Sequence, residues 1–295
     1  MIQLRNVTKR FGNNLAVDDL SLSVPAGEIF GLLGHNGAGK STAIGMMLGQ
    51  VWPTAGQVLL RGRDVTQDRR AALQAVGAIF EAPVFYNELS AWRNLDILSS
   101  YTARTPSNRI AEVIEWVGLK GRERDTVKTY SHGMRARLAL AQALLPQPEL
   151  LILDEPGDGL DPEGIHEMRQ TILRLRKELG LTILLSSHLL AEVEQVCTQI
   201  AVLNHGRKLF QGALSEARQA QNWVRLRTDN FAASAAALRD AHLILDDRDD
   251  NFILPAPSIE TDKIVHCLVS AGHRVFEIAR EEQTLEHFYL SLMKK

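Results

Sequence analysis

The sequence contains a glycine-rich run, ending in Lys, Ser and Thr, that could hold the phosphates of a nucleotide. The run covers residues 34–42 and fits the pattern GxxxxGK[ST], between a predicted buried strand and a predicted helix. Glycines let the backbone curl so that its N–H groups point at phosphate oxygens, and the N-terminus of the following helix favours anions. We expect Lys40 to reach the β- and γ-phosphates and Ser41 to bind Mg²⁺. The predicted nucleotide-binding residues of the run are Gly34, His35, Asn36, Gly37, Ala38, Gly39, Lys40, Ser41 and Thr42.

Two adjacent carboxylates end a second apolar run. Residues 150–153 are Leu-Leu-Ile-Leu, and Asp154 and Glu155 follow them directly. A buried strand that ends in acids needs a compensating charge, because an unpaired buried carboxylate is costly. Mg²⁺ would supply that charge: Asp154 would hold the metal, directly or through water, and Glu155 would orient and polarise the attacking water. Alone, the run could be a strand that leads into an acidic loop, but after a phosphate loop it predicts a hydrolytic site.

The sequence Tyr-Ser-His-Gly-Met at residues 130–134 resembles the signature sequence of the ATP-binding-cassette (ABC) ATPases, which is most often Leu-Ser-Gly-Gly-Gln. Ser131 and Gly133 match that pattern, whereas Tyr130, His132 and Met134 depart from it. In the family this motif opens a helix whose N-terminus meets the γ-phosphate bound by the other subunit. The resemblance therefore implies that Ser131 and Gly133 bind the nucleotide of a partner copy, and a hydroxyl with free N–H groups at a helix start suits an anion. As an isolated feature the motif would be only a helix cap.

The same resemblance gives roles to further residues. Phe11 matches the aromatic residue that stacks on adenine, although without the resemblance it could be a core or edge-strand residue. His188 follows the predicted strand 182–186 and matches the histidine that contacts the γ-phosphate and helps to hold Glu155 and the water. Residues 159–161, Gly-Leu-Asp, match the loop that communicates across the dimer.

Glu81 is the clearest departure from the family pattern. Most members carry a glutamine there, which touches Mg²⁺ and links the site to the transmembrane partner; a glutamate keeps an oxygen ligand and adds charge. The expected metal ligands are therefore Ser41, Glu81 and Asp154. Glu81 and the residues that follow it are similar to the antibiotic-exporter branch typified by bacitracin-resistance ATPases. The aromatic residues of segment 82–92 either form a docking surface for the membrane partner or pack against the helical subdomain; they are Phe85, Tyr86 and Trp92.

The order of apolar runs predicts an α/β domain over residues 1–214, with predicted buried strands at 28–33, 150–153 and 182–186. Residues 88–146 read as an inserted helical subdomain, with helix starts at Ser90, Pro106 and Ser131. Residues 215–295 predict a small α+β domain. Its expected strands are 223–227, 242–246 and 252–254, and its expected helices are 231–241 and 259–269. Together with the resemblance to ABC ATPases, these elements imply an α/β fold: a P-loop NTPase of the ABC-ATPase type with a C-terminal accessory domain.

Composition excludes several classes of protein. Charged residues make up 23% of the 295 residues, and the formal net charge is −2. The sequence has no long run of like charges, so it does not suggest a tail that binds nucleic acid. Cys197 and Cys267 are too few for a zinc cluster or a disulfide framework, which fits a reducing compartment. No apolar run reaches the roughly 18 residues of a membrane span, and the N-terminus lacks the apolar core of a signal peptide. If the protein works at a membrane, another component holds it there.

The resemblance implies an ATP-hydrolysing, Mg²⁺-dependent subunit of an ABC transporter. We expect a homodimer at the cytoplasmic face of the membrane, held by separate permease subunits, with export favoured by the branch. A non-transport ABC ATPase acting on DNA or the ribosome is the first alternative, but the chain has one cassette and no long coiled-coil insertion. A regulatory subunit without hydrolysis is the second; Lys40, Asp154, Glu155 and His188 argue against it. No feature identifies the transported substrate.

Overall fold

The computed structural model describes residues 1–81, 84–102, 106–219, 223–248, 251–280 and 284–293. The chain divides into two compact units, Met1–Leu214 and Ser215–Lys295. Each unit has its own buried apolar core, so each is described by itself. None of the described helices has the length and apolarity that would be needed to cross a membrane.

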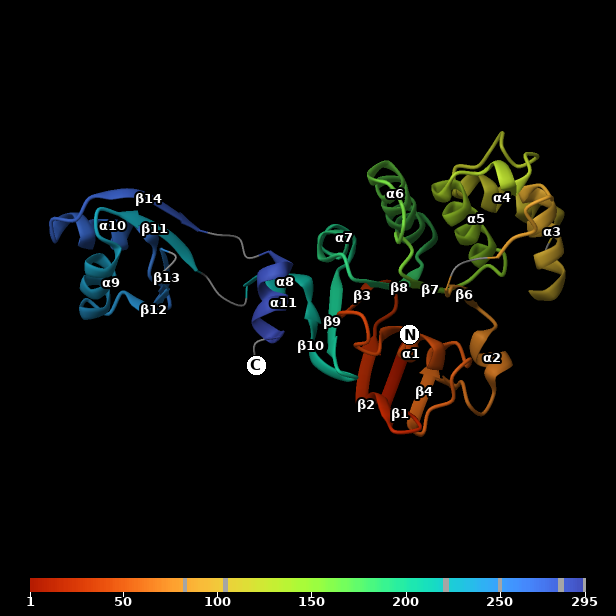
Figure 1. Cartoon of the computed structure of the whole chain (residues 1–295), viewed down its shortest axis with the longest axis horizontal. Helices are drawn as coiled ribbons and strands as arrows, with labels where there is room; N and C mark the ends of the chain where they lie inside the picture. Colours follow the sequence, from red (N-terminus) through yellow and green to blue (C-terminus); the bar gives the residue numbers. More distant parts are fainter. Residues whose placement is uncertain (82–83, 103–105, 220–222, 249–250, 281–283, 294–295) are drawn as a thin grey trace. The chain divides into compact units, whose positions relative to one another are not determined.

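A six-stranded sheet forms the centre of the first unit (Figure 1). Its strands, in spatial order, are β10 (Arg207–Ala213), β9 (Gln199–Asn204), β3 (Ile29–Leu33), β8 (Thr182–Ser187), β7 (Leu150–Asp154) and β6 (Val76–Ile79). All neighbours are parallel except β9 and β10. The strands predicted at 28–33, 150–153 and 182–186 are confirmed as β3, β7 and β8. Since carboxyl ends of parallel strands share one edge, the residues that follow these three strands lie together.

A smaller antiparallel sheet packs on the other side of helix α1 (Lys40–Met47). Its order is β2 (Asn14–Val24), β1 (Ile2–Phe11), β4 (Ala55–Leu60) and β5 (Arg63–Asp64). Helix α1 contacts β2 and β4 of this sheet and β7 of the central sheet. Its buried face, which includes Ile44 and Met47, therefore joins the two sheets in one core. The short helix α2 (Arg69–Leu73) follows β5 and leads into β6.

The described residues between β6 and β7 are mainly helical. Helices α3 (Ala91–Thr102), α4 (Ser107–Trp116) and α5 (His132–Leu144) contact one another in pairs, and a single 3₁₀ turn, η1 (Val127–Thr129), precedes α5. The three predicted helix starts are confirmed, because each helix begins directly after the expected residue. Ser90 Oγ accepts a hydrogen bond from Arg93 N at 3.2 Å, and Ser131 Oγ accepts one from Met134 N at 3.2 Å. Two more helices flank β8: α6 (Pro162–Leu179) and α7 (Leu190–Val196).

The second unit has the order strand, helix, strand, strand, helix, strand. These elements are β11 (Val224–Thr228), α9 (Phe231–Asp240), β12 (Ile244–Arg248), β13 (Phe252–Pro255), α10 (Thr261–Ser270) and β14 (Val275–Arg280). The sheet is antiparallel in the order β12-β13-β11-β14, which is the ferredoxin-like arrangement. Helices α8 (Leu214–Gln219) and α11 (Leu285–Met293) stand before and after it in the chain. The expected strands and helices of this region are found within a few residues; α8, β14 and α11 are not among the predicted elements.

Candidate active site

The glycine-rich run forms a loop between β3 and α1, and two of its glycines have backbone angles that favour glycine. Gly37 has φ 83° and Gly39 has φ 102°. A Cβ at Gly39 would lie 2.7 Å from the carbonyl oxygen of Ala16, which is closer than real Cβ atoms come. The loop is closed by a hydrogen bond from Ala38 N to His35 O at 3.0 Å. The left-handed Gly39 ends the loop and lets α1 begin at Lys40.

Lys40 is a buried cation with anionic and carbonyl partners. Only 5% of the residue is exposed. Its Nζ donates to Gly34 O at 2.7 Å and lies 3.4 Å from Glu155 Oε1. A buried ammonium group needs such partners, and the carbonyl of Gly34 and the carboxylate of Glu155 supply them.

The two carboxylates are joined to β8 through one serine. Ser186 Oγ donates to Asp154 Oδ1 at 2.5 Å and accepts from Glu155 N at 2.9 Å. Glu155 has φ 47°, a left-handed angle that costs a non-glycine residue about 1–3 kcal/mol and is concentrated at functional sites. Ser186 therefore fixes both the carboxylate of Asp154 and the backbone from which Glu155 projects.

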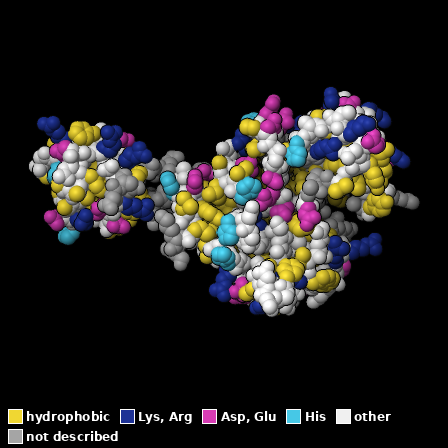
Figure 2. Space-filling view, viewed as in Figure 1, with side chains coloured by type: hydrophobic (Ala, Val, Ile, Leu, Met, Phe, Trp, Pro, Cys, Tyr) yellow, Lys and Arg dark blue, Asp and Glu magenta, His cyan; other side chains and the backbone are white. Residues whose placement is uncertain are grey.

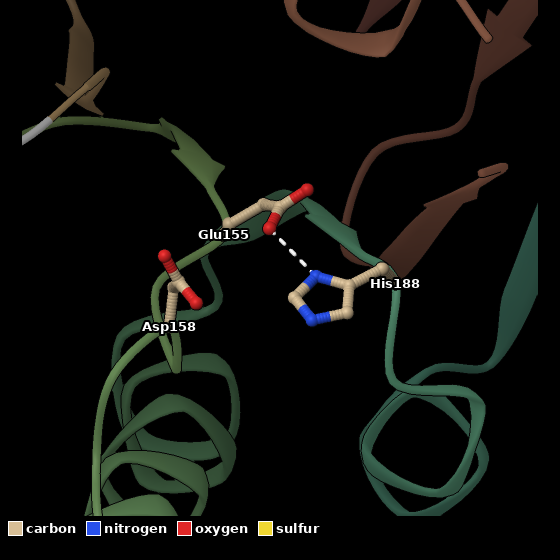
Figure 3. A group of neighbouring side chains, drawn as sticks. All are labelled: Glu155, Asp158 and His188. Atoms are coloured by element: carbon tan, nitrogen blue, oxygen red, sulfur yellow. Dashed lines mark hydrogen bonds and ion pairs between the residues drawn. The ribbon is translucent and has the colours of Figure 1, made fainter. Parts of the chain in front are cut away.

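His188 reaches Glu155 from the end of β8. The distance between His188 Nδ1 and Glu155 Oε2 is 2.7 Å, and Figure 3 shows the ring edge turned toward the carboxylate. Asp158 lies beside them: one ligand atom from each of the three residues falls within 4.8 Å of the others. The parallel order of β7 and β8 produces this pairing of residues 33 positions apart.

A pocket of about 470 Å³ opens above the phosphate loop. It contains most of the predicted nucleotide-binding run together with Glu155. Its lining residues are Asn14, Leu15, Ala16, His35, Asn36, Gly37, Gly39, Lys40, Ser41, Thr42, Glu155 and His205. Such a volume lies within the range of small-molecule sites. Phe11 is not among the lining residues; 48% of it is exposed, and Lys9 Nζ lies 4.7 Å from its ring centre.

A second pocket, of about 400 Å³, contains the three expected metal ligands, Ser41, Glu81 and Asp154. Ser41 and Glu155 line both pockets, so the two are adjacent. A hydroxyl and two carboxylates are the oxygen donors that Mg²⁺ prefers. The donor set therefore fits Mg²⁺ next to the phosphate loop.

Ser131 and Gly133 stand apart from the phosphate loop of their own chain. Ser131 is the N-cap of α5, and among the described residues neither it nor Gly133 lines either pocket. His132, between them, does line the second pocket, and its Nε2 lies 3.0 Å from where a Cβ on Gly159 would stand. A single copy thus does not bring the signature serine to its own Lys40.

The aromatic residues of segment 82–92 have different environments. Residues 82 and 83 lie outside the described part of the chain. Phe85 is buried, whereas 60% of Tyr86 is exposed. Trp92 is half-buried, with the guanidinium carbon of Arg124 5.2 Å from its ring centre. Phe85 is therefore buried within the chain, whereas the side chain of Tyr86 is accessible to a partner.

Several residues of the site were not singled out from the sequence. Asn14, Leu15, Ala16 and His205 line the first pocket, and Ser186 connects the two carboxylates. Position 186 was included in a predicted strand, but its neighbours in the sequence carry no signal for contact with Asp154. His205 lies in the turn between β9 and β10, and no motif marks it.

Comparison with known proteins gives a consistent result. The family model described as ABC transporter matches residues 17–158. The chain is 37% identical over 293 residues to the uncharacterized ABC transporter ATP-binding protein YhcH of Bacillus subtilis, covering 99% of this chain and 95% of the relative. It is 36% identical over 297 residues to the bacitracin transport ATP-binding protein BcrA of Bacillus licheniformis, covering 99% and 97%.

Among solved structures, the chain is similar to cbiO1 from Clostridium perfringens, part of the ABC transporter complex cbiONQ. The TM-score is 0.67 at 25% identity, and the match covers 73% of this chain and 89% of that one. The matched share agrees with the size of the first unit rather than of the whole chain.

Proposed function

Because the chain belongs to the ABC transporter family of ATP-binding proteins, we propose that it binds and hydrolyses ATP with Mg²⁺ to drive export through separate permease subunits. The observation that carries the proposal is the meeting of Lys40, Glu155 and His188 at the ends of β3, β7 and β8. Export is favoured because one of the relatives is a bacitracin transport ATP-binding protein. An ATPase subunit of this kind works at the cytoplasmic face of the membrane.

The mechanism begins with the exchange of partners at Lys40. Its ammonium, now 3.4 Å from Glu155, turns to the β- and γ-phosphates when ATP enters, and the loop N–H groups take the remaining phosphate oxygens. The carboxylate of Glu155 is then free to accept a proton from the attacking water. His188 holds Glu155 through the 2.7 Å contact and keeps that carboxylate aimed at the γ-phosphate.

Mg²⁺, held by Ser41, Glu81 and Asp154, would neutralise charge on the β- and γ-phosphates. Ser186 fixes Asp154 for this role through its 2.5 Å hydrogen bond. Glu81 has φ 59°, a left-handed angle that directs its side chain into the second pocket from the end of β6. A carboxylate at this position adds one more negative charge beside the cation.

The site is completed by a second copy of the chain. Ser131 and Gly133 do not line either pocket of their own chain, yet the start of a helix such as α5 offers N–H groups without helical partners, and Ser131 adds a hydroxyl. Two copies that present α5 to each other's phosphate loops would enclose two ATP molecules. Hydrolysis then removes the anion that holds the halves together, because only the ATP-bound state has these contacts.

ATP-dependent dimerisation tests this function. We would measure the mass of the Glu155→Gln protein by light scattering in ATP with Mg²⁺, and of Glu155→Gln combined with Ser131→Arg as the matched variant. The expected result is a stable dimer in the first protein and a monomer in the second, since the long arginine side chain would fill the anion site. A dimer that forms equally without ATP, or in both proteins, would contradict the proposal.

The contact with a permease is tested at Tyr86. A photo-crosslinking amino acid replaces Tyr86 in membranes that contain the native partner, and the control is the same amino acid at Trp52, which is similarly exposed at 58% against 60%. We expect a crosslink from position 86 alone to a polypeptide with membrane-spanning segments, identified by mass spectrometry. Equal labelling at both positions would argue against Tyr86 as the docking residue.

A further inference from the structure

The turn between β9 and β10 brings a histidine to the nucleotide pocket from outside the phosphate loop and the carboxylate strand. His205 is the first residue after β9, it is exposed, and it lines the 470 Å³ pocket together with Lys40 and Glu155. Its place in the sequence, far from residues 34–42, gives no indication of this position. Figure 2 shows histidine side chains on the same visible face of the first unit as acidic ones.

The turn is held against the phosphate loop by its backbone. Gly206 N donates to Ala38 O at 3.0 Å, and Asp18 N donates to Gly206 O at 3.0 Å. A Cβ at Gly206 would lie 2.8 Å from the carbonyl oxygen of Ala16, so the chain passes the β1–β2 hairpin at close range. The position of His205 is therefore set by the loop that would bind the phosphates.

Both ring nitrogens of the neighbouring His35 already have hydrogen-bond partners. Its Nδ1 lies 2.6 Å from Asn36 O and its Nε2 lies 2.8 Å from Asn204 Oδ1. The His35 ring meets the His205 ring edge to face, with centroids 5.3 Å apart and an interplanar angle of 65°. The nitrogens of His205 have no hydrogen-bond partner among the residues that the structure describes, so they remain available to a ligand in the pocket.

We propose that His205 is a further nucleotide-binding residue that donates a hydrogen bond to the phosphate chain of ATP. This inference rests on the proposed function, because it requires a nucleotide in the pocket. An imidazole N–H that donates to a phosphate oxygen forms a charge-assisted hydrogen bond, which is stronger than a bond between neutral groups.

Three further titratable side chains line the same pocket as His205: His35, Lys40 and Glu155. Asp18 of β2 and Arg207 of β10 adjoin the turn, since Asp18 N donates to Gly206 O and Arg207 follows Gly206 in the chain. Asp18 and Arg207 neutralise each other, with Arg207 Nη2 2.6 Å from Asp18 Oδ2. Lys40 and Glu155 form the other pair. The charged side chains of the pocket and of the adjoining turn therefore occur as two ion pairs.

The variant His205→Asn tests the inference, and His242→Asn is the matched control. Both histidines are exposed and have left-handed backbones, with φ 46° and 54°, and asparagine tolerates such angles well. ATP affinity is measured by calorimetry on the full chain with Mg²⁺, under the same conditions for both variants and the wild type.

We expect His205→Asn to bind ATP about three- to tenfold more weakly than the wild type. His242→Asn should follow the wild type. If the wild type binds ATP and His205→Asn binds it equally well, the inference is wrong and the proposed function stands. If the wild type does not bind ATP, both are overturned.

Discussion

Replacing Glu155 by glutamine separates the two roles that the structure gives to this side chain. Glutamine keeps the shape and can still accept a hydrogen bond from His188 Nδ1, but it cannot take a proton from water or balance Lys40. A positioned general base contributes about 10²- to 10⁴-fold to a rate. We therefore expect the hydrolysis rate to fall by about that factor.

The effect on ATP binding has the opposite sign. Two unit charges 3.4 Å apart attract each other by about 5 kcal/mol at an effective dielectric constant of about 20. Because a quarter of the Glu155 side chain is exposed, solvent screening and the desolvation of both groups reduce the net value to about 1 kcal/mol. ATP must break this pair to reach Lys40 in the wild type but not in the variant. A difference of about 1 kcal/mol makes ATP binding roughly fivefold tighter.

The assay combines calorimetric titration with ATP and release of phosphate in a single turnover. Glu149→Gln is the control, because it breaks an ion pair that lines neither pocket: Glu149 Oε2 lies 3.0 Å from Arg61 Nε. It should change neither the ATP affinity nor the rate of hydrolysis. Weaker ATP binding by Glu155→Gln would refute the competition between Glu155 and phosphate for Lys40. A hydrolysis rate within tenfold of the wild type would refute the role of Glu155 as base.

Three further predictions concern stability and reactivity. Gly77→Ala should lower the free energy of unfolding by about 3 kcal/mol or more, because its Cβ would stand 2.0 Å from the carbonyl oxygen of Ala143 on α5; an unchanged urea midpoint would contradict the packing of α5 on β6. Burial raises the pKa of Tyr130 from 10.0 to about 12, so its contribution to stability is complete below about pH 10 and is lost as the pH rises toward 12. The free energy of unfolding of Tyr130→Phe, measured in urea, should lack that loss. The same pH dependence in the wild type and in Tyr130→Phe would contradict the role of Tyr130. Burial also raises the pKa of the Cys197 thiol far above its usual range, so a thiol reagent should modify half-buried Cys267 well before Cys197; mass spectrometry of the labelled peptides would show the reverse order if Cys197 were accessible.

The motifs with local signals were the ones that the sequence could predict. The glycines around Lys40, the apolar run before Asp154 and the helix start at Ser131 each depend on residues within a few positions, because loop curvature, strand burial and capping are local properties. The family assignment and the α/β fold followed from these motifs, and both are confirmed. The small second unit was predicted for the same reason, except for α8, β14 and α11.

The tertiary structure decided which distant residues meet. Ser186 bridges Asp154 and Glu155 because β7 and β8 are parallel neighbours, and His205 enters the pocket because β9 lies beside β3. The order of strands in a sheet depends on contacts between segments far apart in the chain, so periodicity and spacing do not predict that order. The sequence by itself determined the chemical groups and the turns that present them. Only the packing of the central sheet determined that Lys40 and Glu155 form an ion pair, and that an unmarked histidine stands beside them.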